Sequence, residues 1–161
     1  MKKYELKIYP DPVLRKLAQP VTEIDNIINR LIKGMSKIMY SYQGIGLAAP
    51  QVGKLLRVVT ADIGEGLISM INPEILMGLG EDYLEEGCLS VPDTRVNIKR
   101  RQSIFVRYIN LNEIEMESEF TGLTARVIQH EVDHLNGILI TDHYTLFKKL
   151  KLSIKNNLKY L

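Results

Sequence analysis

The segment from His130 to His134, which reads His-Glu-Val-Asp-His, constrains the fold of this chain more than any other stretch. In an α-helix, residues four apart project from one face about 40° from each other, so one ion can accept both imidazoles. Glu131 follows the first histidine, where a carboxylate can handle the protons of a bound water instead of binding the ion. Two unrelated histidines on an ordinary helix are the less common explanation of this pattern. The spacing therefore predicts a metal-binding helix.

A catalytic zinc-type site takes three protein ligands and leaves one position open, so a third donor must lie elsewhere in the chain. Thermolysin-like peptidases use a downstream glutamate, but no glutamate follows Glu131. In the metzincin pattern HExxHxxGxxH, Gly137 is in register, but the last position is Ile140 and the next histidine, His143, comes three residues late. Neither peptidase pattern supplies the missing ligand.

Cys88, the single cysteine of the chain, is the remaining soft donor. A lone cysteine cannot form an internal disulfide and is more often a small buried residue than a ligand. The missing third ligand of the histidine pair reverses that expectation, and Gly87 beside it allows the backbone to approach closely. We therefore expect Cys88, His130 and His134 to bind one metal ion.

Length and composition limit the number of domains and the kinds of partner that the chain can have. The 161 residues, 45% hydrophobic and 25% charged, are ordinary for a single compact domain over 1–161. A formal charge of +2 indicates neither sequence-specific nucleic-acid binding nor a membrane partner. No apolar stretch is long enough to span a bilayer and the start does not read as a signal peptide, so we expect a cytoplasmic protein.

The first part of the chain predicts an extended lead-in followed by a helix. Three prolines between residues 8 and 21 rule out a long regular element there. From Thr22, with Asp25 as a capping partner, apolar residues that include Ile27 recur at the helical period to about Ser41. This stretch predicts a helix that faces the core.

The rest of the chain predicts short strands and two more helices, and so an α+β fold with mostly antiparallel sheets around a central helix carrying HExxH. That helix is expected to begin at 121–124 and to run to Asn136, where Gly137 supplies a stop. A C-terminal helix is expected over 143–158, with its lysines on a solvated face. The expected strands cover 56–60, 67–71, 94–98, 103–109 and 114–120.

Three stretches, in this order, resemble the characteristic motifs of the peptide deformylase family. They are Gly-Ile-Gly-Leu-Ala-Ala-Pro-Gln at 44–51, Glu-Gly-Cys-Leu-Ser at 86–90 and Gln-His-Glu-Val-Asp-His-Leu at 129–135. The first is not the phosphate-binding GxGxxG, because Ala49 replaces the third glycine and no clear strand precedes it. The resemblance implies an enzyme that removes the formyl group from the initiator methionine of nascent polypeptides.

The catalytic roles follow from the resemblance. It implies that the cysteine and both histidines bind the metal, and that Glu131 is the general base and acid while a metal-bound water attacks the formyl carbon. Gln51 and the backbone N–H of Leu89 would hold the formyl oxygen, where negative charge grows in the reaction. Arg95 matches a family arginine, for which we expect a structural ion pair with Glu86.

The resemblance also implies how a formylmethionyl peptide would bind. Backbone groups at Ile45 and Gly46 would pair with an extended peptide, so specificity would come from a pocket for the methionine side chain. The stem of Arg126 would lie near that pocket. The residues expected to bind substrate are Ile45, Gly46, Leu84, Gly87, Leu123 and Val127.

Metal identity and partners are less constrained. The resemblance suggests Fe²⁺ in the cell, and a thiolate–imidazole site also accepts Zn²⁺, Ni²⁺ or Co²⁺. The basic tail is a candidate for contact with the ribosome near the exit of nascent chains. Two other functions stay open from the residues: a metallopeptidase that cuts internal peptide bonds, and a metal-stabilised binding module without turnover.

Overall fold

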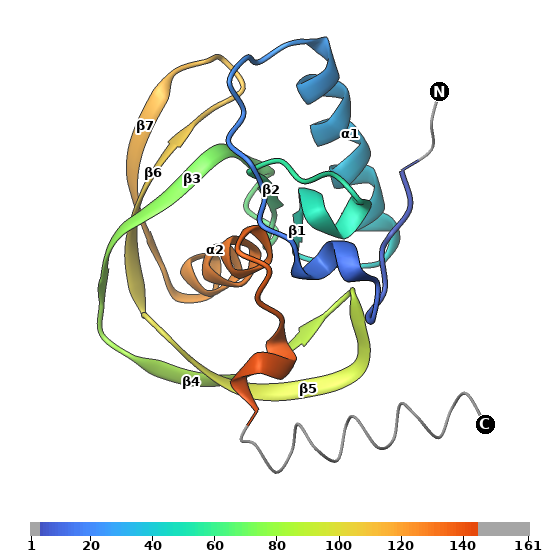
Figure 1. Ribbon diagram of the computed structural model, residues 1–161. Coiled ribbons are helices and arrows are strands. Elements are labelled where there is room, and N and C mark those ends of the chain that lie inside the picture. The colour runs from blue at the N-terminus through green and yellow to red at the C-terminus, as the bar shows by residue number, and fades with distance from the viewer. Residues whose placement is uncertain (1–3, 145–161) are drawn as a thin grey trace, which may run out of the picture.

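The computed structural model of the protein describes residues 4–144 and contains two antiparallel sheets (Figure 1). One is five-stranded, with the strand order β1-β2-β3-β6-β7, and the other pairs β4 with β5. The strands of the first sheet are β1 (Gly46–Ala48), β2 (Val58–Ala61), β3 (Ile68–Leu79), β6 (Ser103–Ile109) and β7 (Glu115–Thr121). The second sheet is formed by β4 (Asp82–Cys88) and β5 (Val91–Arg100).

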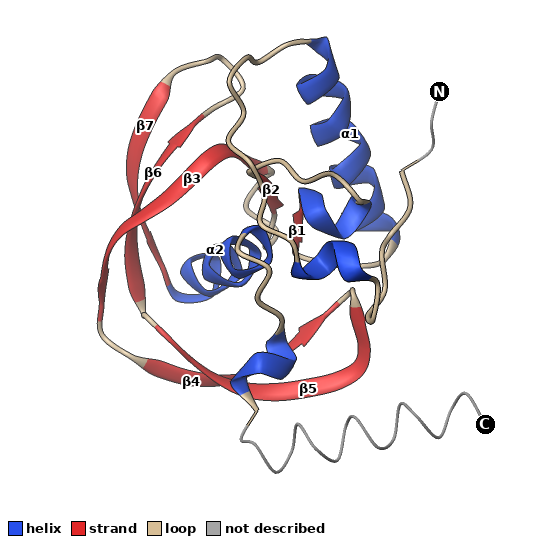
Figure 2. Cartoon of the chain, viewed as in Figure 1, coloured by secondary structure: helices blue, strands red, loops and turns tan. Residues whose placement is uncertain are grey.

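Helix α2 (Gly122–Leu135) lies at the centre of the molecule, between the five-stranded sheet and the β4–β5 pair (Figures 1 and 2). Its apolar stripe, which includes Ala125, Ile128 and Leu135, is buried against the larger sheet. The helix ends where Gly137 adopts a left-handed conformation with φ +72°. The predicted α+β fold, with antiparallel sheets around the helix that carries HExxH, is thus confirmed.

Helix α1 (Asn26–Ser41) packs its buried face on the start of the larger sheet, as the periodicity predicts. Its N-cap is Asp25, whose carboxylate accepts hydrogen bonds from the backbone N–H groups of Ile27 and Ile28. The expected start at Thr22 is therefore four residues early. Ile27 was also expected in the core, but this position is wrong: its side chain is 64% exposed, because the first turn directs it away from the sheet.

The strand predictions are right in position but incomplete. All five expected runs overlap strands, whereas β1 and β4 have no clear sequence pattern, since β1 has three residues and β4 carries several acidic side chains. Strand β3 continues to Leu79, well past its expected end, and irregular register with β6 accompanies this length. The lead-in contains a short 3₁₀ helix, Pro12–Arg15.

The chain beyond α2 forms a second short 3₁₀ helix, Ile140–His143, and the expected helix over 143–158 otherwise lies outside the described residues. A further 3₁₀ turn, Ala49–Val52, follows β1. None of the helices within residues 4–144 is both long and apolar enough to cross a membrane.

Candidate metal centre

Helix α2 places the two histidines of the HExxH segment side by side. The Nε2 atoms of His130 and His134 lie 3.2 Å apart, and both side chains are buried. They meet because residues four apart stand one above the other on the same helix face. The helix thus supplies two nitrogen donors that face one point.

Cys88, at the end of β4, completes the group. A tight turn to β5, in which Cys88 pairs with Val91, brings the thiol against α2. The Cys88 Sγ atom lies 3.2 Å from His134 Nε2, and the three potential ligand atoms all lie within 4.8 Å of one another. Ligand distances of about 2.0–2.3 Å in a tetrahedral zinc-type site would separate neighbouring donors by roughly 3.3–3.6 Å. The three residues therefore fit one metal ion.

Glu86 orients the first histidine. Its Oε2 lies 3.0 Å from His130 Nδ1, and Arg100 and Arg126 also bond the same carboxylate. Burial would raise the pKa of Glu86, but the hydrogen bonds from His130 and Arg100 outweigh it and lower that pKa to about 2. An ionised Glu86 holds a proton on His130 Nδ1, so that Nε2 is the nitrogen that would give up its proton and bind a metal ion.

The titration of the two histidines reflects the charge around them. Burial alone would lower the pKa of His130, but hydrogen bonds with Cys88 and Glu86 raise it to about 10. Burial and the neighbouring His130 hold the pKa of His134 well below its ordinary value. The Glu86 carboxylate that favours a proton on His130 would likewise favour a metal cation between the three donors.

Glu131 lies beside this group without being part of it. The side chain is 4% exposed, and its Oε2 has no hydrogen-bond partner within the described part of the chain. Burial raises the pKa of Glu131 to about 7. A carboxyl group that titrates near neutrality, with one oxygen free for a ligand, suits proton transfer at this site.

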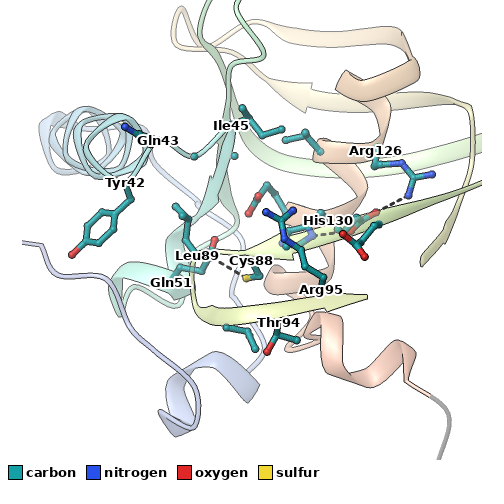
Figure 3. Close-up of a pocket in the computed structure, with 18 of the residues that line it drawn as sticks. Tyr42, Gln43, Ile45, Gln51, Cys88, Leu89, Thr94, Arg95, Arg126 and His130 are labelled. Carbon is teal, nitrogen blue, oxygen red and sulfur yellow. Dashed lines mark hydrogen bonds and ion pairs between the residues drawn. The ribbon is translucent and has the colours of Figure 1, made fainter. Parts of the chain in front are cut away.

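Gln51 approaches the thiol from the 3₁₀ turn after β1. Its Oε1 accepts a hydrogen bond from the backbone N–H of Ala48 at 2.8 Å. Its Nε2 lies 3.1 Å from Ser90 Oγ and 3.7 Å from Cys88 Sγ, so the amide donor faces the site (Figure 3). Leu89 follows the cysteine in the β4–β5 turn and lines the cavity that opens at this site.

A cavity of about 840 Å³ opens over these residues, walled by β1, the β4–β5 pair and α2 (Figure 3). Of the residues expected to bind substrate, Ile45, Gly46, Gly87, Leu123 and Val127 line it. Leu84 is not among the lining residues, and its side chain is 49% exposed on β4. The cavity therefore brings Cys88, His130 and Glu131 together with residues expected to bind substrate.

The ion pair expected between Arg95 and Glu86 does not form. Glu86 bonds Arg100 and Arg126 instead, and Arg95 lines the cavity beside Gly87. Sequence reasoning therefore missed the role of Glu86 and of its two arginine partners. The available signal was general: a metal-binding histidine commonly donates its second N–H to a carboxylate.

The chain is similar to known proteins over most of its length. Residues 3–150 match the family model described as polypeptide deformylase. The chain is 48% identical over 150 residues to the peptide deformylase of Thermotoga neapolitana, covering 92% of each chain. It is also similar to two solved peptide deformylases. The Thermotoga maritima structure has a TM-score of 0.86 and 46% identity, covering 90% of this chain and 99% of the other. The Acinetobacter baumannii structure bound to Met-Ala-Ser has a TM-score of 0.83 and 34% identity, covering 88% of this chain and 98% of the other.

The match spans nearly the whole chain, and the three motifs that carry the resemblance meet at one cavity. The resemblance inferred from those motifs is thereby confirmed. The chain belongs to the polypeptide deformylase family.

Proposed function

We propose that this protein hydrolyses the formyl amide at the initiator methionine of nascent polypeptides, as one catalytic domain over 1–161. The observation that carries the proposal is the convergence of Cys88, His130 and His134 beside the buried carboxyl of Glu131. Family membership supports the same reaction. The cavity of about 840 Å³ above these groups is large enough to admit the end of a peptide.

The three donors would hold one divalent cation. Such an ion supplies Lewis acidity, which lowers the pKa of water and polarises a carbonyl group. Glu131 takes the proton of the attacking water on Oε2, which has no partner among residues 4–144, and returns it to the leaving amine. Its pKa of about 7 in the buried site lets the same carboxyl both accept and release a proton near neutral pH.

Two donors would hold the formyl oxygen as its charge grows. The Gln51 amide already presents Nε2 toward Cys88, and the Leu89 backbone follows that cysteine in the turn. Donors fixed before the reaction stabilise the developing charge without having to reorganise.

The peptide would lie in the cavity as an extended strand. Ile45 and Gly46 on one side and Gly87 on the other would offer backbone groups to it, and Leu123 and Val127 would contact the methionine side chain. A Cβ atom on Gly46 would lie 2.4 Å from Glu131 Oε1, so only glycine lets the backbone pass this close to the proton carrier. The Met-Ala-Ser peptide bound to the Acinetobacter baumannii relative is consistent with such a substrate.

We also propose Fe²⁺ as the ion in the cell, with Zn²⁺, Ni²⁺ and Co²⁺ able to replace it, because thiolate and imidazole ligands accept all four. Elemental analysis of protein prepared without oxygen, and rapid loss of activity in air, would identify iron. The substrate further suggests that the protein works in the cytoplasm near the ribosome, where nascent chains emerge.

A deformylation assay on a short formyl-Met peptide tests the proposal. Metal-replete protein should release formate from this peptide and leave casein and a blocked internal peptide intact. Cleavage of casein with no action on the formyl peptide would indicate an endopeptidase instead. A protein that binds metal but turns over neither substrate would be a binding module.

A further inference from the structure

Ser90 lies outside the cavity lining but contacts a residue within it. The side chain is fully buried, two positions after Cys88 in the β4–β5 turn. Its Oγ lies 3.1 Å from Gln51 Nε2. This contact joins two segments that are 39 residues apart in the chain.

The amide of Gln51 can be oriented without ambiguity. The backbone N–H of Ala48 is a donor only, so the atom 2.8 Å from it must be the amide oxygen. The amide nitrogen therefore faces Ser90 and Cys88, so one of its two hydrogens is directed to Ser90 Oγ and the other to Cys88 Sγ. One bond at the oxygen alone would leave the amide plane free to rotate about that bond.

We infer that Ser90 is a positioning residue that fixes the amide plane of Gln51 and so aims its second N–H at the reacting oxygen. The inference rests on the proposed role of Gln51 as a donor to the formyl group. Ser90 accepts one hydrogen of Nε2, and the other is directed at Cys88 Sγ, 3.7 Å from Nε2 and beside the metal position. A donor that is held before substrate arrives loses no freedom during the reaction, which favours the transition state over the bound peptide.

Ser90→Ala removes the second anchor and leaves Gln51 in place. In zinc-loaded protein, the ¹⁵N order parameter of the Gln51 side-chain amide should fall, while metal content stays at one ion per chain. The value of kcat should fall about threefold to tenfold, the size of one hydrogen bond, with KM little changed. In a Gln51→Ala background, Ser90→Ala should change kcat by less than about twofold.

Ser69→Ala is the matched control, because Ser69 in β3 is also buried but its hydroxyl has no hydrogen-bond partner within residues 4–144. It should alter neither the Gln51 order parameter nor kcat. If Ser90→Ala does not fold, Ser90→Gly, which lacks the same oxygen, is measured in place of Ser90→Ala. An unchanged order parameter, or an equal loss of kcat with and without Gln51, would overturn the inference. The order parameter does not depend on deformylation. It therefore tests whether Ser90 fixes the Gln51 amide even if the proposed reaction is wrong.

Discussion

Glu131 combines almost complete burial with an oxygen that has no partner within the described residues. Burial of an unpaired carboxyl is costly, so such a group is usually retained for a ligand or for chemistry. Its neighbour Gly46 lies close to the other carboxylate oxygen, Oε1, and leaves space beside it. At the scale of single residues, the site is thus built around a proton carrier whose environment disfavours its charge.

Glu131→Ala is expected to keep nearly full metal occupancy, because the side chain is not one of the three grouped ligands. Deformylation should fall about 10²–10⁴-fold, the usual share of a general acid–base group. Elemental analysis and kcat/KM on a formyl-Met peptide measure the two effects. Glu23→Ala, at an exposed position before α1, is the control and should change neither. Activity that survives in Glu131→Ala would contradict the acid–base role.

Glu86→Gln should weaken metal binding about 10–100-fold, because the amide no longer holds the proton on His130 Nδ1. It also removes the buried charge that Arg100 and Arg126 share, so that Arg100 keeps only Asp133 and Arg126 only the more distant Asp82 among the described carboxylates. The loss of unfolding free energy should reach at most about 3–5 kcal/mol. Chelator competition and urea denaturation measure these losses. A variant with unchanged metal affinity would show that this carboxylate is structural only.

The pKa of Glu86 also predicts an effect of pH. Since this pKa falls from 4.5 to about 2 on folding, the stabilisation is complete above about pH 4.5 and is lost as the pH drops toward 2. The unfolding free energy of the wild type should therefore decline more steeply over this range than that of Glu86→Gln.

At the scale of elements, α2 depends on a sharp end directly after its metal-binding face. Gly137 has φ +72°, and a Cβ there would lie 2.6 Å from the carbonyl oxygen of Arg15 in the lead-in. Arg15 itself reaches the Gly137 carbonyl and forms an ion pair with Asp142. The lead-in and the segment after α2 therefore hold the end of the helix between them.

Gly137→Ala should lower the unfolding free energy by more than the roughly 1–2 kcal/mol that a left-handed residue with a Cβ costs, because the methyl group also meets backbone. Gly122→Ala is the matched control, since Gly122 has φ +57° and open space around its Cβ position. Thermal denaturation compares the two variants. Equal losses would show that the contact with Arg15 is easily relieved.

The elements also show what the sequence could predict. The helix period placed His130 and His134 on one face, which needs only local geometry. The partners of Glu86 could not be predicted, because they lie 14 to 44 residues away and meet only when β4, β5 and α2 pack. Strand β4 was missed for a related reason: its acidic residues show no period, and pairing with β5 defines it.

At the scale of the whole molecule, the metal position joins parts that are otherwise separate in the fold. Cys88 belongs to the β4–β5 pair, whereas both histidines belong to α2, which packs on the larger sheet. An ion bound by all three would cross-link the two sheets through the central helix. Metal binding should therefore contribute to the stability of the folded chain.

Removal of the metal should lower the melting temperature. A ligand present at about 1,000 times its Kd adds about 4 kcal/mol to the unfolding free energy, and a chelator that removes the metal abolishes this contribution. Calorimetry with and without chelator measures the shift, which should be much smaller for Cys88→Ala. An identical response in this variant would mean that the stabilising ion binds elsewhere.

The most direct test is metal content and formyl-Met peptide deformylation, measured together on wild-type and Cys88→Ala protein prepared without oxygen. Wild-type protein should contain one ion per chain and release formate, and Cys88→Ala should lose both the ion and the activity. Full metal content in Cys88→Ala, or deformylation by metal-free wild-type protein, would contradict the assignment of the thiol and the two imidazoles to one catalytic ion.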